Sequence, residues 1–289
     1  MITKILIFFI KILLRNSIKG STVITLYLAK KIKELQEFAV SVPGGMLIFD
    51  FRINCFHGII TNSKKLTGEH LISKKIIKHN DVVFDLGANV GLYSVWFSEL
   101  VGENGKVFSF EPNSILFNSL TKSFSLKKNI QLFPVAISDF NGNADFFLPE
   151  DQTMASLSDW TGDLPNTVIK NTCHVKTLDS LLFNGIIPTP SFIKCDIEGG
   201  ELGSFKGSYN LLNVVEAPII LFEANINTSK GFGLTSLDAI HYLQNLEKPK
   251  FKFFLVDDLG ELAEFMDQVI IHANILAIPE SKIYILNSI

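Results

Sequence analysis

The chain has 289 residues, of which 47% are hydrophobic and 19% are charged. This composition excludes an intrinsically disordered protein, and the length fits one α/β domain with an extra segment or two modest domains. The three cysteines, Cys55, Cys173 and Cys195, are too few and too far apart for a disulfide framework or a zinc knuckle. They favour a reducing compartment, and we therefore expect a cytoplasmic protein.

The formal net charge of −3 combines two unlike segments. Residues 1–40 contain seven Lys or Arg and two Glu, a net charge of +5, whereas the remaining residues have 19 basic and 27 acidic side chains, a net charge of −8. An acidic body without a basic stripe is a poor ligand for a polyanion. We therefore expect no nucleic-acid partner.

The first predicted element is a basic, apolar helix at the N-terminus. The apolar run at residues 5–10 is far shorter than the ~20 residues that cross a bilayer, and Lys11 interrupts it, which argues against a signal peptide. In a helix, Lys4, Lys11 and Arg15 fall in one stripe with apolar side chains around it. This pattern is typical of a helix lying in a membrane interface. We expect peripheral membrane contact through residues 1–20 on the cytoplasmic face, with packing on the protein itself or on a second subunit as the alternative.

A second helical stretch is predicted over residues 22–40, and from residue 81 short apolar runs alternate with amphipathic ones. The apolar runs predict strands at 82–85, 106–110, 130–135, 192–195, 218–222, 251–256 and 274–278. Helical patterns lie at 91–101, 113–127, 201–213 and 234–246, and residues 139–172 read as an inserted hairpin and loop. The alternation indicates right-handed βαβ units, and hence an α/β fold with a doubly wound, mostly parallel, seven-stranded sheet. We expect residues 80–289 to form one cofactor-binding domain and residues 1–79 to be its helical extension and lead-in.

The loop after the first of these strands has the pattern of a ligand-binding turn. It contains Gly87, Asn89 and Gly91, and small residues between a strand and a helix let a ligand approach backbone N–H groups closely. The spacing differs from the Gly-x-Gly-x-x-Gly of dinucleotide sites, and Asp85 at the strand end would repel a pyrophosphate. The loop suits a ligand with a cationic amino group and no phosphate, such as S-adenosylmethionine.

A second acidic residue, Glu111, follows the next strand, twenty residues after Gly91. An acid at this place accepts hydrogen bonds from both hydroxyls of a ribose. The structural alternative is that Asp85 caps the following helix and Glu111 is a surface carboxylate.

Together these segments resemble the FkbM family of methyltransferases. The resemblance covers about residues 80–280 in the family's order. It is carried by Asp81-Val-Val-Phe-Asp-Leu-Gly-Ala-Asn-Val-Gly91, Phe110-Glu-Pro112, Ala136-Ile-Ser-Asp139, Thr177-Leu-Asp179 and Phe192-Ile-Lys-Cys-Asp-Ile-Glu-Gly-Gly-Glu201. It implies the Rossmann-like class I methyltransferase fold, S-adenosyl-L-methionine as cofactor, and mostly O-methylation. One departure is Cys195, where the family has an aliphatic residue, and a small buried hydrophobe there is tolerable.

The resemblance also implies a set of cofactor-binding residues: Asp85, Gly87, Ala88, Asn89, Gly91, Glu111, Ala136, Ser138 and Asp139. In this set the loop after the first strand lines the methionine end of the cofactor and Glu111 holds the ribose. Ala136 lies near the adenine, with Ser138 and Asp139 at the edge of the pocket.

Three carboxylates are the candidates for catalysis. Asp196 and Glu198 project to the same side of an extended strand end, and Glu223 ends the next strand at the same rim. A carboxylate there could orient a hydroxyl acceptor or take its proton, while the fold positions the two reactants for an in-line displacement. The alternatives are that the Asp-x-Glu pair holds a divalent metal such as Mg²⁺, or that the acids are structural, with Glu201 capping the helix that begins there.

The histidines are His57, His70, His79, His174, His241 and His272, and no pair of them has a metal-binding spacing. His174, just after the inserted loop, is a weak candidate base, and the sequence predicts no dedicated metal site.

The predicted function is therefore an S-adenosylmethionine-dependent O-methyltransferase acting on a hydroxyl of a sugar, glycan or polyketide-like acceptor. The acceptor pocket is expected to come from residues 41–79 and 139–172. One alternative is an NAD(P)-dependent oxidoreductase on a Rossmann sheet, which the Gly-x-Asn-x-Gly loop argues against. Another is a catalytically inactive, membrane-associated interaction protein, which the intact Asp85, Glu111 and Asp196 argue against.

Overall fold

A mixed central sheet organises the protein. The computed structural model describes residues 2–16, 18–53, 59–60, 65–125, 127–161 and 168–288. These residues form a sheet of eight strands, in the order β12 (Leu262–Glu264), β11 (Lys252–Val256), β13 (His272–Ile278), β10 (Ile219–Asn225), β9 (Phe192–Cys195), β3 (Val82–Leu86), β4 (Lys106–Phe110) and β5 (Ile130–Phe133). The five strands from β10 to β5 are parallel, and β13 runs antiparallel to both of its neighbours. The predicted α/β class is confirmed, with the three-residue β12 as an eighth strand beyond the seven predicted.

The strand order places a switch point in the middle of the sheet. The chain passes from β3 outward through β4 to β5, and then returns to β9 on the other side of β3. Ligands of open α/β sheets bind at such a point, beyond the carboxyl ends of the strands. The ends of β3 and β9 are therefore where a site is expected.

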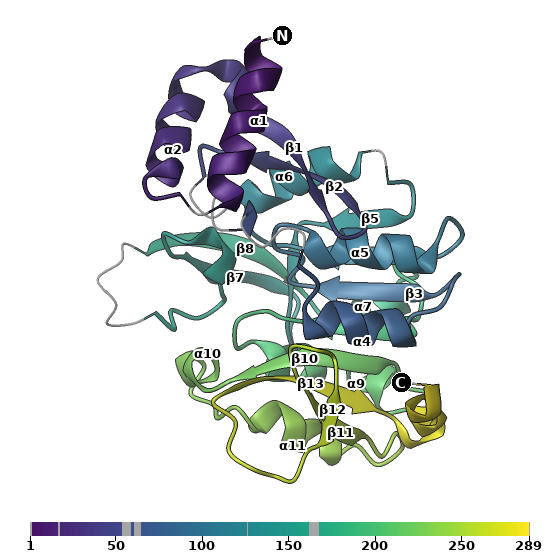
Figure 1. The fold of residues 1–289 in the computed structure, drawn as a ribbon. Helices are drawn as coiled ribbons and strands as arrows, with labels where there is room; N and C mark the ends of the chain where they lie inside the picture. Colours follow the sequence, from purple (N-terminus) through teal and green to yellow (C-terminus); the bar gives the residue numbers. More distant parts are fainter. Residues whose placement is uncertain are drawn as a thin grey trace.

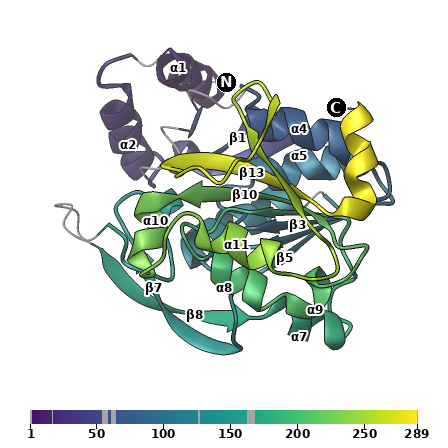
Figure 2. The same cartoon turned by 90° about the horizontal axis from the view of Figure 1, so that it is seen from below.

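Helices cover both faces of this sheet (Figure 2). One face packs against α4 (Gly68–Ile76) and α5 (Leu92–Val101), whose apolar side chains meet those of β3, β4 and β10. The other face packs against α7 (Leu178–Phe183), α8 (Glu201–Lys206), α9 (Tyr209–Leu212) and α11 (Asp238–Gln244). The remaining elements of this region are α6 (Ser114–Phe124), α10 (Ile226–Gly231) and the C-terminal 3₁₀ segment η3 (Glu280–Ser288).

Two predicted elements are divided in the structure. The predicted strand 130–135 splits at Pro134, because proline has no N–H for the ladder: β5 stays in the central sheet and β6 (Val135–Ile137) joins another. The predicted helix 201–213 is two helices that meet at Gly207, where a Cβ atom would lie 2.0 Å from the Ser138 carbonyl oxygen.

The inserted hairpin predicted at 139–172 is present. It consists of β7 (Gly142–Leu148) and β8 (Ile169–Lys176), which pair antiparallel, and β8 also pairs with β6 in a second, three-stranded sheet. The connection from β7 begins with a short 3₁₀ turn, η2 (Gln152–Met154), which lies over the end of the central sheet.

The N-terminal residues form two helices and a hairpin. The helices are α1 (Ile2–Arg15) and α2 (Ser21–Lys31), followed by the 3₁₀ turn η1 (Lys33–Leu35), β1 (Glu37–Val42) and β2 (Gly45–Asp50). The helix predicted over 22–40 was therefore too long. Burial in β1 alternates from residue to residue, and this period of two is that of a strand.

This N-terminal segment lies at one end of the molecule (Figure 1). Its buried side chains, among them Ile10, Ala29 and Leu47, share one hydrophobic cluster with Leu116 and Leu120 of α6. No helix in the described part of the chain is long and apolar enough to cross a membrane. Cys55 and His57 lie outside the described residues. The domain boundary at residue 80 stays a prediction.

Candidate active site

The loop between β3 and α5 approaches the end of β9 very closely. Gly87 has φ +81°, and a Cβ atom on it would lie 2.0 Å from the carbonyl oxygen of Asp196. Any side chain at this position would push the two strand ends apart, so glycine is required by close approach as well as by its backbone angle. The contact brings the β3 loop and the β9 end to one site.

Glu111 is held rigidly at the end of β4. Its side chain accepts hydrogen bonds from the backbone N–H of Asn89 at 2.7 Å and of Asn113 at 2.8 Å, and the residue is 5% exposed. Burial raises the pKa of Glu111 to about 7, although the two backbone hydrogen bonds favour its ionised form. Each carboxylate oxygen keeps lone pairs for a further donor, as a ribose diol requires.

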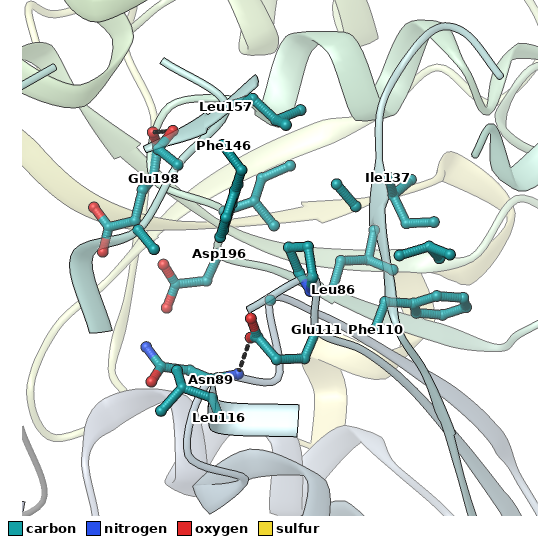
Figure 3. Close-up of a pocket in the computed structure, with 18 of the residues that line it drawn as sticks. Leu86, Asn89, Phe110, Glu111, Leu116, Ile137, Phe146, Leu157, Asp196 and Glu198 are labelled. Carbon is teal, nitrogen blue, oxygen red and sulfur yellow. Dashed lines mark hydrogen bonds between the residues drawn. The ribbon is translucent and has the colours of Figure 1, made fainter. Parts of the chain in front are cut away.

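Glu111 lines a pocket over the carboxyl ends of the strands. Apolar side chains supply most of its wall: Leu86, Phe110, Leu116, Val135, Ala136, Ile137, Phe146, Ala155 and Leu157. Figure 3 shows Asp196, Glu198 and Asn89 at one end of the pocket and Phe110 and Ile137 at the other. The pocket thus offers an apolar slot for a flat ring at one end, a fixed carboxylate in the middle and a polar end.

The structure brings half of the twelve predicted site residues together in this pocket. The predicted residues that line it are Gly87, Asn89, Glu111, Ala136, Asp196 and Glu198. Ala88, Gly91, Asp139 and Glu223 are not among its lining residues. Ser138 also lies outside the pocket, because its carbonyl oxygen and side chain pack against Gly207 and Gly203 of α8. The cofactor contacts of Ala88, Gly91, Ser138 and Asp139 and the catalytic role of Glu223 remain predictions.

Asp85 is buried beneath the loop and does not line the pocket. It accepts a hydrogen bond from the hydroxyl of Ser94 at 2.5 Å, which ties β3 to α5. Its Oδ1 atom is buried with no hydrogen-bond partner among the described residues. Burial raises the pKa of Asp85 to about 6, and the nearby Lys194 opposes that rise. The acid thus ties β3 to α5 through the Ser94 side chain and does not cap the helix as the alternative interpretation expected, since the N-cap of α5 is Gly91. Direct contact of Asp85 with a cofactor remains a prediction.

Lys194 is a site residue that sequence reasoning missed. It lies within β9 and is fully buried, with its Nζ atom 2.8 Å from Asp196 Oδ2 and 4.3 Å from the centre of the Tyr93 ring. Burial is the largest single influence and disfavours its charge, but the combined attraction of Asp196, Tyr93 and Asp85 outweighs burial, and the pKa of Lys194 is raised. A lysine inside an otherwise apolar strand was the signal that could have found it.

Two further acids lie beside Asp196. Glu198 has a left-handed backbone, φ +56°, and burial together with the charges of Asp196 and Glu223 raises its pKa to about 9. Glu201 accepts hydrogen bonds from the N–H groups of Ile197 and Gly199, and burial raises its pKa to about 8. Glu201 therefore holds the turn before α8. The described residues contain no group of three or more His, Cys, Asp or Glu side chains placed to bind a metal ion.

The inserted segment closes one wall of the pocket. The Asn89 amide donates a hydrogen bond to the Thr153 carbonyl at 3.0 Å, and the Asn113 amide donates to Gln152 Oε1 at 3.2 Å. The Ser156 hydroxyl donates to the Glu198 carbonyl at 2.8 Å. Residues 152–157 are thus bound both to the loops that follow β3 and β4 and to the acidic end of the site. They fall within the segment 139–172 that was expected to contribute to the acceptor pocket, but which of its residues line the pocket could not be read from the sequence, because the segment has no motif.

The arrangement can now be compared with known proteins. The model of the methyltransferase FkbM domain matches residues 85–268, well over half of the chain. The chain belongs to the FkbM methyltransferase family. This confirms the family resemblance that the sequence motifs indicated.

This member of the FkbM methyltransferase family is also similar to individual proteins. It is 26% identical over 171 residues to the hexuronic acid methyltransferase AglP of Haloferax volcanii, an alignment that covers 57% of this chain and 66% of that protein. Among solved structures it resembles the methyltransferase FkbM of Methylobacillus flagellatus, with 15% identity, 78% of this chain and 53% of that chain covered, and a TM-score of 0.46. It also resembles an O-methyltransferase of Thermotoga maritima, with 11% identity, coverage of 84% and 85%, and a TM-score of 0.40. The chain thus spans just under two thirds of AglP and about half of the first of these structures.

Proposed function

We propose that this protein transfers a methyl group from S-adenosylmethionine to a hydroxyl of a sugar or glycan. The choice of cofactor is supported by Glu111, a carboxylate that two backbone N–H groups hold in the middle of an apolar slot. The acceptor class is suggested by the relative AglP, which is named for methylation of a hexuronic acid.

The residues at the polar end suit this chemistry. When bound, the cofactor supplies a methyl group on a cationic sulfur. Lys194 keeps the Asp196 carboxylate oriented by an ion pair at 2.8 Å, and Asp196 presents negative charge to that end of the pocket. With a pKa of about 9, Glu198 carries its proton near neutral pH and can donate a hydrogen bond to an acceptor oxygen. These groups bind and orient the reactants. Much of the rate acceleration of an in-line displacement comes from such positioning.

Ligand-dependent thermal stability tests the cofactor. S-Adenosylmethionine and S-adenosylhomocysteine are expected to raise the melting temperature, because a ligand at about 100 times its Kd stabilises the native state by ~2.7 kcal/mol. Glu111→Gln should remove most of this rise, whereas the exposed Glu103→Gln should keep it. A rise with NADH and none with either methionine derivative would overturn the proposal and favour an oxidoreductase.

We also propose that α1 and α2 bind the surface of an anionic membrane. In α1, Ile10 and Leu14 are buried against the body, whereas Ile5, Phe8 and Phe9 on the other side are 49%, 60% and 55% exposed. Apolar side chains of α2 and of the turn before it are exposed as well: Ile18, Val23, Ile24 and Tyr27. Exposed lysines accompany them, namely Lys4, Lys19, Lys30, Lys31 and Lys33. Exposed apolar side chains flanked by cations match a layer of anionic headgroups above acyl chains.

The stripe of cations differs from the one the sequence suggested. Lys11 does not point outward: its Nζ atom donates a hydrogen bond to the Ala39 carbonyl and lies over the Phe38 ring. The membrane-facing charge would therefore come from the other lysines. Free buried thiols at Cys173 and Cys195 fit the proposed cytoplasmic side of the membrane.

Vesicle sedimentation tests the membrane surface. The full chain should sediment with vesicles containing phosphatidylglycerol and release at high salt, and the Phe8→Ser, Phe9→Ser double variant should lose most of this binding. The control is Phe183→Ser, which removes a side chain that is 92% exposed on α7. Equal binding by the double variant would refute the proposal. Dimerisation through the same residues, without vesicle binding, would assign the surface to a second copy of the chain.

A further inference from the structure

A histidine that the sequence did not single out lies at the sheet edge beside the acidic end of the site. His272, at the start of β13, has its Nε2 atom 2.6 Å from Oε1 of Glu223 near the end of β10. The histidine side chain is 59% exposed and the glutamate side chain 17%. Since β13 is antiparallel to β10, its first residue lies at the same sheet edge as the carboxyl ends of β9 and β10.

The strand register places this pair next to Asp196. Phe222 pairs with Cys195, so the next residues along the two parallel strands, Glu223 and Asp196, are neighbours. Residues that pair across strands, and those two apart along a strand, point to the same face of a sheet. Asp196, Glu223 and His272 therefore form one row along the sheet edge. The charge of Asp196 acts on Glu223 and, after burial, is the main cause of its raised pKa.

The other acids at this end are poorly suited to accept a proton. Glu198 already carries one near neutral pH. Asp196 is paired with Lys194, and Glu201 is engaged by two backbone N–H groups. The imidazole differs, because a carboxylate that accepts a hydrogen bond from one ring nitrogen leaves the other nitrogen as the basic atom and stabilises the imidazolium that forms.

We propose that His272, oriented by Glu223, is the base that takes the proton of the acceptor hydroxyl. The inference rests on the proposed methyl transfer. As the acceptor oxygen forms its bond to the methyl carbon, the bond from that carbon to the sulfonium sulfur breaks and its electron pair stays on sulfur. The hydroxyl proton passes to Nδ1 of His272. The imidazolium then shares the charge-assisted hydrogen bond with Glu223, which acts as a positioning residue.

The test compares two histidine–carboxylate pairs of this chain. His241 pairs with Asp267 at 3.1 Å and serves as the matched control, because it lies on α11 and not in the row that Asp196, Glu223 and His272 form at the sheet edge. Purified His272→Ala and His241→Ala are assayed by transfer of labelled methyl from S-adenosylmethionine to free glucuronic acid and to a glycan fraction of the source cells. Melting temperature with S-adenosylhomocysteine is the second readout.

His272→Ala should lower kcat about 10² to 10³-fold, keep the full rise in melting temperature, and regain at least tenfold activity with added imidazole. Glu223→Gln should lower kcat less, and His241→Ala should match the wild type. Unchanged kcat in His272→Ala, or a loss that imidazole does not restore, would overturn the role of His272 as base. A wild type that binds S-adenosylhomocysteine but labels neither saccharide would overturn the acceptor class instead, and the inference with it.

Discussion

At the scale of single residues, the site depends on compensated charge. The fully buried Lys194 lies among Asp85, Asp196 and the ring of Tyr93, whose hydroxyl donates in turn to Glu69 at 3.0 Å. A cation in this position offsets the repulsion between acids that the sheet edge brings together. Removing it would leave Asp85 buried without a compensating charge.

We therefore expect Lys194→Met to destabilise the protein by about 3 kcal/mol, as loss of one partner of a buried ion pair does. The measurement is urea unfolding at pH 7. The control is Lys170→Met, which breaks an ion pair with Asp145 whose side chains are 59% and 54% exposed and should cost less than ~1 kcal/mol. Equal stabilities of the two variants would mean that the buried charge is not needed for folding.

Some site residues could be predicted from the sequence and others could not. Glu111 could be placed from sequence because its position after a strand and its distance from the glycine loop are local properties. Lys194 and His272 could not, because their neighbours come from other strands and helices: Tyr93 lies 101 positions before Lys194, and Glu223 lies 49 before His272. A side chain's partner across a sheet is fixed by register, and register is not local.

At the scale of elements, apolar runs located the strands of the central sheet to within a few residues. A buried parallel strand reads as a short continuous apolar run, which is a strong signal. The predicted element boundaries were wrong where two elements follow each other directly along the chain. Residues 130–135 read as one strand although Pro134 directs the two halves into different sheets, and residues 37–42 were taken into a helix although they alternate as a strand.

The segment between β7 and β8 shows a further limit at this scale. Residues 152–157 form one wall of the pocket through hydrogen bonds to Asn89, Asn113 and Glu198. The segment contributes one backbone carbonyl, that of Thr153, which every residue type provides, and the side chains of Gln152 and Ser156, which are ordinary loop residues. These residues form no motif that could reveal their partners, although the range 139–172 was expected to contribute to the acceptor pocket.

At the scale of the whole molecule, several buried carboxyl groups make stability depend on pH. The pKa values of Glu111 and Glu201 are raised by burial to about 7 and about 8, so the native protein keeps protons that the unfolded chain has already lost above about pH 5. Because the native state binds more protons in this window, its stability falls as pH rises. His70, whose pKa is lowered by burial to about 4, acts in the opposite direction, but only below about pH 6.5.

The ligand-free protein should accordingly lose stability between pH 6.5 and 8.5, by an amount of order 1 kcal/mol for each carboxyl group that must ionise. Urea unfolding across this range measures it. Glu201→Gln should reduce the dependence, because the amide keeps an acceptor oxygen for the turn and has no proton to lose, whereas exposed Glu103→Gln should leave it unchanged. The part that remains comes from Glu111 and from Glu198, whose pKa is raised to about 9. A stability that is constant or rises with pH would contradict the burial of these acids.

The sequence by itself determined the fold class, the places of the glycine loop and of Glu111 after their strands, and the contrast between a basic N-terminal segment and an acidic body. These follow from local periodicity, spacing and composition. Only the tertiary structure decided that Asp85 anchors a helix, that Lys194 compensates the acids, that residues 152–157 close the pocket and that His272 meets Glu223. The reason is physical: each of these depends on which strands become neighbours and in what register, and that choice is made by the packing of the whole sheet.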